Sequence, residues 1–332
     1  MEIPITQSDA WEKLQRDLRE KAIIRVGNDY QYLAIIKQTP IGNYLYCPYG
    51  PVAEDNIAFK ETLKDLKNQA VTQDAFFIRI EPQNPNFGKL LPGNAKKTKD
   101  LNPKETWVMS LEGEEEQFKE KLPSRLLRYH KAAAKKGITL RSTKNPDDIK
   151  YLIELQKNLA REKGINTFSE HYLKTELSQP FATLYLVEYE SPEGEEETKK
   201  KGVTTRQATG TESNKKQVLA AGLVFDDETT RYNLQGAQSD LGRKMHATGI
   251  LTIEIIKDAR KKGLKYFDFW GIAPEGAPKN HPWAGFTEFK KTFRGETRDY
   301  LGTYDLPLNS IKYTAYQTLR KLNRIKRRIK SS

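Results

Sequence analysis

The sequence contains almost none of the residues on which disulfide, metal or membrane-spanning structure depends. Among its 332 residues it has one cysteine, Cys47, so no intramolecular disulfide can form. The four histidines lack the spacing of metal ligands, and we expect no bound metal. No run of 18 apolar residues occurs, so no membrane-spanning helix is expected. The N-terminus carries acids and no apolar run, unlike a secretory signal, and we expect a cytoplasmic protein.

Acidic residues are also fewer than basic ones. The chain has 44 Asp and Glu against 56 Lys and Arg, a net charge of +12. Such a surface is attracted to nucleic acid, anionic lipid or phosphorylated ligands, although a basic surface can also serve solubility alone. No acid follows Asp305.

One order of elements, β-β-β-α-β, is predicted twice along the chain. In the first copy the strands are 21–26, 30–37, 44–48 and 75–80, with a helix at 57–69. In the second they are 182–189, 217–226, 231–235 and 266–270, with a helix at 249–262. Helices at 9–20 and 145–163 precede the copies. This repetition indicates an internal duplication at domain scale.

The segment 265–293 is the most informative part of the chain. It begins as an aromatic strand that contains a carboxylate, Asp268, which needs a partner if it is buried. A loop at 271–285 and a helix at 286–293 follow, and the helix presents Lys290 and Lys291. A charged strand end next to such a loop often forms a pocket. The alternative is an ordinary buried strand followed by a solvated helix.

This segment resembles the FemABX family, whose members carry an aromatic–Asp–aromatic–Gly strand end followed by Phe-Lys and a further Phe. Here these are Phe267-Asp268-Phe269-Trp270-Gly271, then Phe289-Lys290 and Phe293. Further matches are Gln7-Ser8, Trp11, Tyr49-Gly50-Pro51-Val52, the basic segment 125–137, Gly236-Ala237, Ser239-Asp240, Arg243 and 302–308. The ordered set covers nearly the whole chain.

The resemblance implies an α+β fold of two tandem GNAT (acetyltransferase)-like domains, with the C-terminal helix returning to the first domain. We place domain 1 at 1–142 plus 305–332, and domain 2 at 143–304. A polar segment without aromatics at about 190–216 is expected to be a flexible insert in domain 2.

The implied activity is transfer of an amino acid from aminoacyl-tRNA to the stem peptide of a peptidoglycan precursor, which builds the interpeptide bridge. Aminoacyl esters are already activated, so no cofactor is expected. A coenzyme A-dependent or protein N-terminal acyltransferase is one alternative, although the stretch 243–250, RKMHATGI, lacks the Gly-rich turn that holds a pyrophosphate. A non-catalytic RNA- or membrane-binding protein of the same fold is another.

Lys290, the lysine of the matched Phe-Lys pair, is the candidate for stabilising the oxyanion of the tetrahedral intermediate. Phe289 would pack behind it. Asp268 or Glu81 could accept the proton of the attacking amine, or the tRNA ribose hydroxyl could relay it. The sequence leaves this choice open.

Several other residues are candidates for substrate binding. They are Tyr172, Gln235, Arg243, Trp11, Lys13, Lys37 and Trp270. Related proteins that act on a soluble UDP-linked muramyl peptide hold its diphosphate with two basic residues, and Gln15 and Phe168 occupy those positions here. A lipid-linked precursor such as lipid II is therefore favoured over UDP-MurNAc-pentapeptide.

Two basic helices are candidates for contact with tRNA or lipid phosphate. One, at 124–136, carries Arg125, Arg128 and Lys131. The other begins at Ser310 and carries Arg327 and Arg328. Its apolar residues repeat every three to four positions and are expected to pack on the body of the protein: Ile311, Ala315, Leu319, Leu322, Ile325 and Ile329. The opposite cationic face would then make peripheral contact with an anionic membrane.

Overall fold

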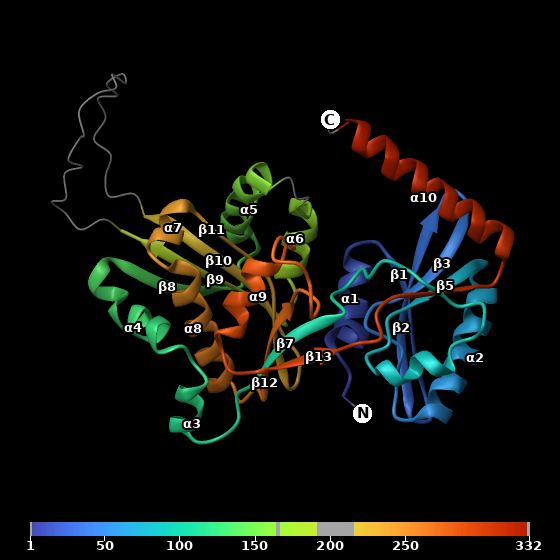
Figure 1. Ribbon diagram of the computed structural model, residues 1–332, viewed down its shortest axis with the longest axis horizontal. Coiled ribbons are helices and arrows are strands. Elements are labelled where there is room, and N and C mark those ends of the chain that lie inside the picture. The colour runs from blue at the N-terminus through green and yellow to red at the C-terminus, as the bar shows by residue number, and fades with distance from the viewer. Residues whose placement is uncertain (1, 164–166, 191–215, 331–332) are drawn as a thin grey trace. The chain divides into compact units, whose positions relative to one another are not determined.

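The computed structural model describes residues 2–163, 167–190 and 216–330, without the side chains of 158–159, 161–163 and 324–330 (Figure 1). The chain divides into two compact units. Unit 1 comprises Met1–Trp107, Trp270–Glu288 and Thr297–Ser332, and unit 2 comprises Val108–Phe269 and Phe289–Glu296. The predicted insert at about 190–216 lies almost entirely outside the described residues. Within the described residues, no helix combines the length and apolar character needed to cross a membrane.

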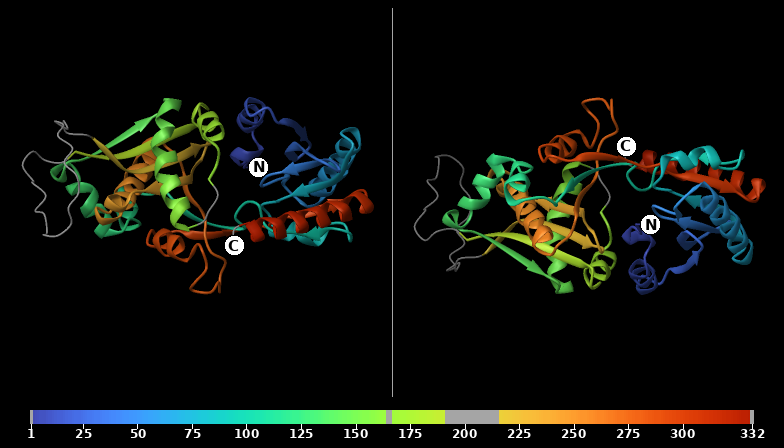
Figure 2. Two further views of the ribbon diagram at one scale, coloured as in Figure 1. Left: turned by 90° about the horizontal axis from the view of Figure 1, so that it is seen from above. Right: turned by 90° about the horizontal axis from the view of Figure 1, so that it is seen from below.

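Unit 1 is built on a sheet with the order β1-β2-β3-β5-β14-β6, with β4 paired to β2. The strands are β1 (Lys21–Gly27), β2 (Tyr30–Thr39), β3 (Gly42–Cys47), β4 (Val52–Ala53), β5 (Ala75–Ile80), β6 (Lys96–Lys97) and β14 (Tyr304–Pro307). The helices are η1 (Ile5–Gln7), α1 (Asp9–Asp17), α2 (Asn56–Thr72), η2 (Pro85–Leu90) and α10 (Ser310–Lys330). The sheet lies between α2 and α10 (Figure 2). Alternation along β5 therefore buries apolar side chains on both of its faces.

The second sheet has the order β13-β7-β12-β11-β10-β9-β8. Its strands are β7 (Glu105–Ser110), β8 (Ile138–Thr143), β9 (Ala182–Tyr189), β10 (Gln217–Asp226), β11 (Thr230–Gln238), β12 (Tyr266–Gly271) and β13 (Glu296–Asp299). The α-helices are α3 (Glu115–Glu120), α4 (Ser124–Ala132), α5 (Ile149–Lys163), α6 (Glu170–Leu177), α7 (Asp240–Lys244), α8 (Ala247–Lys261) and α9 (Ala284–Lys291). Short 3₁₀ turns are η3 (Ala134–Lys136) and η4 (Pro146–Asp148). The strands of the second predicted copy, β9 to β12, form the centre of this sheet.

The predicted duplication and the α+β fold are confirmed. In each unit three successive strands pair antiparallel, a helix follows, and the next strand pairs parallel with the third. This parallel pair is β3 with β5 in unit 1 and β11 with β12 in unit 2. A parallel pair requires a crossover connection, which α2 and α8 provide.

The division between the units differs from the expected boundary at 142/143. Residues 108–142 belong to unit 2, because α4 packs on α8. Leu126 of α4 fills the space next to Gly249 of α8, where an added Cβ would lie 2.6 Å from its Cδ2. His130 Nε2 lies 2.7 Å from a carboxylate oxygen of Glu254. The sequence analysis missed this packing because glycine gives no hydrophobic signal.

The C-terminal helix returns to the first sheet as predicted, but with the opposite face. Tyr313 and Tyr316 pack against Phe77 of β5 at ring distances of 5.4 and 5.2 Å. The predicted packing face is wrong, since Ile311, Leu319 and Leu322 are exposed. The aromatic face prevails because Tyr313 also donates a hydrogen bond of 2.9 Å to the buried carboxylate of Asp305, which the aliphatic residues cannot do.

Candidate active site

Asp268 and Lys290 lie close together in unit 2, on β12 and α9. The aromatic side chains that flank them form a cluster in which Phe267, Phe269 and Phe293 are at most 1% exposed. Ring centroids are 4.7 Å apart for Phe267 and Phe269, and 4.9 Å apart for Phe269 and Phe293. This cluster ties the strand to the residues that follow α9. It places the buried carboxylate of Asp268 near the ammonium group of Lys290.

The surroundings of Lys290 change its acidity. Burial lowers the pKa of its ammonium group to about 8, and the charge of Asp268 opposes that shift. Lys290 is therefore mainly protonated at neutral pH but loses its charge just above it. A partly desolvated cation of this kind can stabilise a developing negative charge more strongly than a solvated one.

The two residues next to Lys290, Phe289 and Lys291, differ in packing and burial. The ring of Phe289 packs on Phe293, with ring centroids 5.6 Å apart. That Phe289 packs behind Lys290 and fixes its direction stays a prediction. Lys291 is exposed, whereas Lys290 is half-buried. The two adjacent lysines therefore differ in burial and provide a matched pair for comparison.

A second polar cluster in unit 2 joins two of the predicted substrate-binding residues through one that the sequence analysis missed. Gln235 of β11 donates a 3.0 Å hydrogen bond to Glu176 of α6, and its own side-chain oxygen accepts one of 3.1 Å from Gln156 of α5. Tyr172 also hydrogen bonds to Glu176. We call Tyr172, Glu176, Gln235 and Gln156 the Glu176 cluster. Oε1 of Gln156 is buried and has no hydrogen-bond partner within the described part of the chain.

Glu176 itself is only 3% exposed. Burial raises the pKa of its carboxyl to about 8, and the hydrogen bond from Tyr172 offsets part of this rise. The carboxyl is therefore largely protonated at neutral pH. Its signal in the sequence was its position between Leu173 and Leu177, at the spacing of one buried helix face.

Glu81, a candidate proton acceptor, lies in unit 1 and is 2% exposed. One carboxylate oxygen accepts from Thr303 Oγ1 at 2.6 Å and from the backbone N–H groups of Leu101 and Asn102 at 3.3 Å. The other accepts from Tyr46 at 2.9 Å and from the Asn102 side chain at 2.7 Å. Five donors occupy this carboxylate, which suits a residue that fixes a loop.

Trp270 adopts a left-handed backbone conformation, with φ of 67°, at the end of β12. A bulky residue rarely adopts this conformation. Its ring packs edge-on to Tyr49 at 5.4 Å, and the Tyr49 hydroxyl donates a 2.8 Å hydrogen bond to the carbonyl of Pro103. These contacts hold the indole in place within unit 1.

The remaining charged candidates are exposed or half-buried and paired with acids close in sequence or on a neighbouring element. Lys13 pairs with Asp17 at 2.9 Å, Lys37 with Glu20 at 2.9 Å, and Arg243 with Asp240 at 3.3 Å. Trp11 lies on α1. The described contacts do not join these residues into one cluster.

The two positions expected to be basic in UDP-substrate enzymes are not surface cation sites here. Gln15 is 5% exposed, within α1. Phe168 stacks on Tyr172 with ring centroids 4.8 Å apart.

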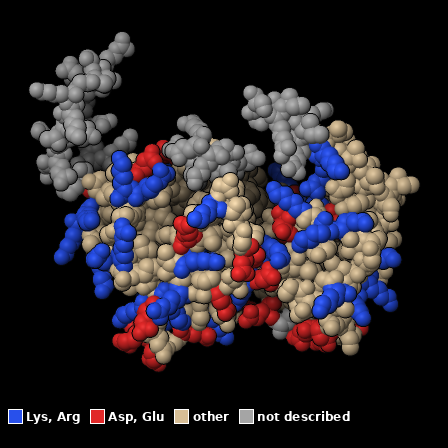
Figure 3. Space-filling model, viewed as in Figure 1, with Lys and Arg blue, Asp and Glu red and all other residues tan. Residues whose placement is uncertain are grey.

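The basic helix α4 carries Arg125, Arg128 and Lys131 on its surface. Arg125 Nε donates a 2.8 Å hydrogen bond to the hydroxyl of Tyr129, whose ring stacks on His246 at 4.2 Å. Arg327 and Arg328 lie in the part of α10 whose side chains are not described. Basic and acidic side chains are both present over the face shown in Figure 3.

The helix that follows the third strand is the place where a pyrophosphate could bind backbone N–H groups. In unit 1 the carboxylate of Asp55 already accepts from the N–H groups of Ile57 and Ala58, both at 2.8 Å. In unit 2 Leu126 packs against Gly249 in the first turn of α8. Asp55 therefore occupies the start of α2, and a side chain packs on the glycine in the first turn of α8.

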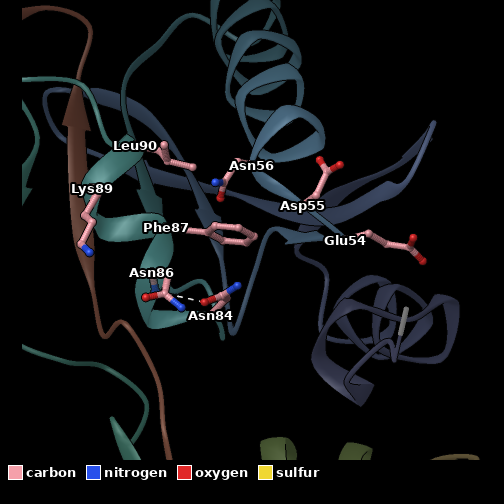
Figure 4. A pocket seen from close by; sticks show the side chains of 8 residues that line it. All are labelled: Glu54, Asp55, Asn56, Asn84, Asn86, Phe87, Lys89 and Leu90. Carbon is pink, nitrogen blue, oxygen red and sulfur yellow. Dashed lines mark hydrogen bonds between the residues drawn. The ribbon is translucent and has the colours of Figure 1, made fainter.

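A pocket of about 460 Å³ lies beside Asp55 in unit 1 (Figure 4). Two of its polar residues are occupied in capping, since Asp55 caps α2 and the Asn84 side chain accepts a 3.0 Å hydrogen bond from the N–H of Asn86. Phe87 at its wall stacks on Phe59 of α2 at 4.1 Å. None of the predicted site residues lines it.

Known proteins resemble this chain in sequence and in fold. Residues 187–321, which contain Asp268 and Lys290, match the model of the FemAB family. No curated protein matches the sequence. The fold is similar to the crystal structure of FemX, with a TM-score of 0.74 and 16% identity over 94% of each chain.

Two further solved structures have the same fold at lower similarity. L-PGS from Bacillus licheniformis has a TM-score of 0.55 at 12% identity, covering 96% of this chain and 98% of that one. The C-terminal domain of a putative lysylphosphatidylglycerol synthetase from Agrobacterium fabrum has a TM-score of 0.54 at 15% identity, covering 94% and 91%. The predicted resemblance to the FemABX proteins is confirmed by the match of residues 187–321 to the FemAB family model and by the similarity to FemX.

Proposed function

We propose that this protein is an aminoacyltransferase that moves an amino acid from aminoacyl-tRNA to the stem peptide of a peptidoglycan precursor. The observation that carries the proposal is the pair formed by Asp268 and Lys290. A buried carboxylate lies near a lysine whose pKa is lowered to about 8, within the segment that matches the FemAB family. Perturbed titratable groups of this kind concentrate at functional sites.

The residues have distinct parts in the proposed reaction. The acceptor amine attacks the carbonyl carbon of the ester, a C–N bond forms, and the carbonyl oxygen becomes an oxyanion that the Lys290 ammonium stabilises. The C–O bond to the tRNA ribose then breaks, and the leaving hydroxyl takes up a proton while the amine loses one. Asp268 either accepts the amine proton or holds the ammonium of Lys290 in place. Glu81 has a structural part, because five donors already occupy its carboxylate.

Lipid II is the favoured acceptor over UDP-MurNAc-pentapeptide. The buried Gln15 and the stacked Phe168 supply no cation for a soluble diphosphate. The Glu176 cluster, with Tyr172 and Gln235, would contact the acceptor through polar groups. Arg125, Arg128 and Lys131 would contact phosphate of tRNA or lipid. With these substrates the protein would work in the cytoplasm, at the inner face of the membrane.

The alternative acyltransferase function, with coenzyme A, is less well supported. The Asp55 carboxylate caps the start of α2, and the start of α8 lacks a Gly-rich turn, since Leu126 packs against its one early glycine, Gly249. A non-catalytic protein of this fold is not favoured, because a buried carboxylate beside a lysine whose pKa is lowered to about 8 is an arrangement that concentrates at functional sites.

Product analysis by mass spectrometry tests the proposal. The protein is incubated with a mixed aminoacyl-tRNA pool and one acceptor at a time: lipid II, UDP-MurNAc-pentapeptide or phosphatidylglycerol. We expect lipid II to gain the mass of one or more amino acid residues, and the gain to disappear when the pool is treated with ribonuclease and deacylated. Modification of phosphatidylglycerol alone, or a product only when acetyl-CoA replaces the tRNA pool, would contradict the proposal.

A further inference from the structure

The outward face of α10 is apolar and exposed. Ile311, Ala315, Leu319 and Leu322, which we call the apolar stripe, follow one another at spacings of four, four and three residues and so share one helix face. Ile311 is 84% exposed, Leu319 41% and Leu322 49%. A shallow hollow on the same helix is lined by Ser310, Ile311, Thr314, Ala315, Thr318 and Leu319.

The apolar stripe is exposed although α10 is well packed on the sheet through its other face. The other face of α10 is fully used, since Tyr313 and Tyr316 pack on Phe77 and the hydroxyl of Tyr313 bonds to Asp305. Alternate aromatic and aliphatic residues thus give α10 two apolar faces, one of which the sheet of unit 1 covers. A contiguous apolar strip on a helix surface usually marks an interaction site.

The charge around the apolar stripe indicates which kind of partner this face would bind. Lys312 and Lys321 flank the stripe, and Lys312 Nζ lies 4.0 Å from Asp74. Arg320 instead lies over the Tyr316 ring on the face that packs on the sheet, and the sequence after Asp305 contains no acid. A second copy of this chain would bring an equally basic helix and a net charge of +12 against it. An anionic partner is therefore favoured over self-association.

We propose that α10 lies in the interface of an anionic lipid bilayer, with the apolar stripe directed into the acyl region and Lys312 and Lys321 at the headgroups. A helix with an apolar face and lysine or arginine at its margins has the chemistry of an interfacial helix, and α10 presents this face already folded. This inference concerns attachment to lipid and does not depend on the transferase activity.

Site-specific fluorescence gives a direct test. Cys47 is fully buried, so Ile311→Cys provides one accessible thiol for an environment-sensitive dye. Val71→Cys on α2, where the native side chain is 72% exposed, is the matched control. With vesicles of phosphatidylglycerol and phosphatidylcholine we expect a blue shift at position 311 and none at position 71. Equal shifts at both positions, or none at either, would overturn the proposal.

A pair of double variants distinguishes insertion of the apolar stripe into the bilayer from electrostatic attraction to its surface. Leu319→Ser with Leu322→Ser should lower partitioning onto these vesicles at least ~10-fold, since it removes apolar area without changing charge. Val26→Ser with Val71→Ser alters apolar residues elsewhere that are even more exposed, at 71% and 72%, and should leave partitioning unchanged. Equal partitioning of the two double variants, or a concentration-dependent dimer that only the Leu319 and Leu322 changes abolish without lipid, would refute the lipid assignment. A blue shift at position 311 with RNA in place of vesicles would also refute it.

Discussion

The two units share one order of elements but hold their buried titratable groups differently. In unit 1 Arg79 and Asp305 form a two-point ion pair at 2.7 and 2.8 Å, and Glu81 is met by five donors. Unit 2 has a comparable structural pair in Arg231 and its carboxylate partners. It also contains Glu176 and Lys290, both with a pKa of about 8.

We infer from this difference that the two units use their buried charged groups for different purposes. Buried charges that are fully hydrogen-bonded fix a fold and are costly to alter. Groups whose pKa is moved toward neutrality can change charge at little cost, which suits acid–base work or ligand contact. Unit 1 thus uses its described buried charges for structure, while unit 2 adds two that are available for chemistry. The predictions below test that contrast.

The largest expected effect is on the stability of unit 1. Asp305→Ala leaves the guanidinium of Arg79 buried without its partner and should lower the free energy of unfolding by about 3–5 kcal/mol. Urea denaturation measures the loss. The double variant Arg79→Met with Asp305→Leu removes both charges and should lose clearly less. A loss below about 1 kcal/mol for the single variant would show that the pair does not secure α10 to the sheet.

Substitution of Lys290 should affect chemistry and not folding. Lys290→Ala is expected to lower turnover of the proposed transfer at least ~10²-fold, equivalent to about 2.7 kcal/mol of transition-state stabilisation. Single-turnover kinetics with aminoacyl-tRNA measure it. The exposed neighbour gives the control, and Lys291→Ala should retain most activity. Similar small losses in both variants would remove Lys290 from the mechanism.

Glu176 should make the stability of unit 2 depend on pH. Its folded pKa of about 8 lies above the unfolded value, so the folded state binds the proton more tightly and stability falls as pH rises from about 4.5 to about 8. Glu176→Gln cannot ionise. It should be more stable than the wild type at pH 9, by up to a few kcal/mol, and similar at pH 5.

The control for this prediction comes from unit 1. Glu81→Gln places an amide donor among the five donors that surround the carboxylate, so it should lower stability at both pH values. Urea denaturation at pH 5, 7 and 9 compares the two variants. If Glu176→Gln, like Glu81→Gln, is less stable than the wild type at pH 9, the Glu176 carboxyl is ionised in the folded protein. The contrast between the units then fails.

The smallest expected effect is a shift of a pH profile. The carboxylate of Asp268 raises the pKa of Lys290, so Asp268→Asn should lower it below 8 and move the alkaline limb of the kcat profile to lower pH, by up to about one unit. Titration of the acceptor amine is common to both proteins and cancels in the comparison. Loss of activity at every pH would instead assign the proton-accepting role to Asp268.

The regular elements and one part of the site could be predicted from the sequence. Strands such as β5 and β9 and helices such as α8 follow from apolar periodicity and length, which are local properties. Asp268 and Lys290 could be selected because they stand in a recognisable order within one short segment. Their proximity also follows locally, since the strand, loop and helix between them are contiguous in the chain.

The tertiary structure decided what local periodicity leaves open. The helix α10 has two apolar faces, and only the sheet with Phe77 and Asp305 determines that the aromatic face is buried. Glu176 becomes a weak acid because β11 and α5 cover it, and Glu81 is fixed by donors such as Thr303, more than 200 residues away in the chain. In each case the sequence determined which groups are present, whereas burial and pairing by distant segments set their charge and exposure, because desolvation depends on what surrounds a group in space.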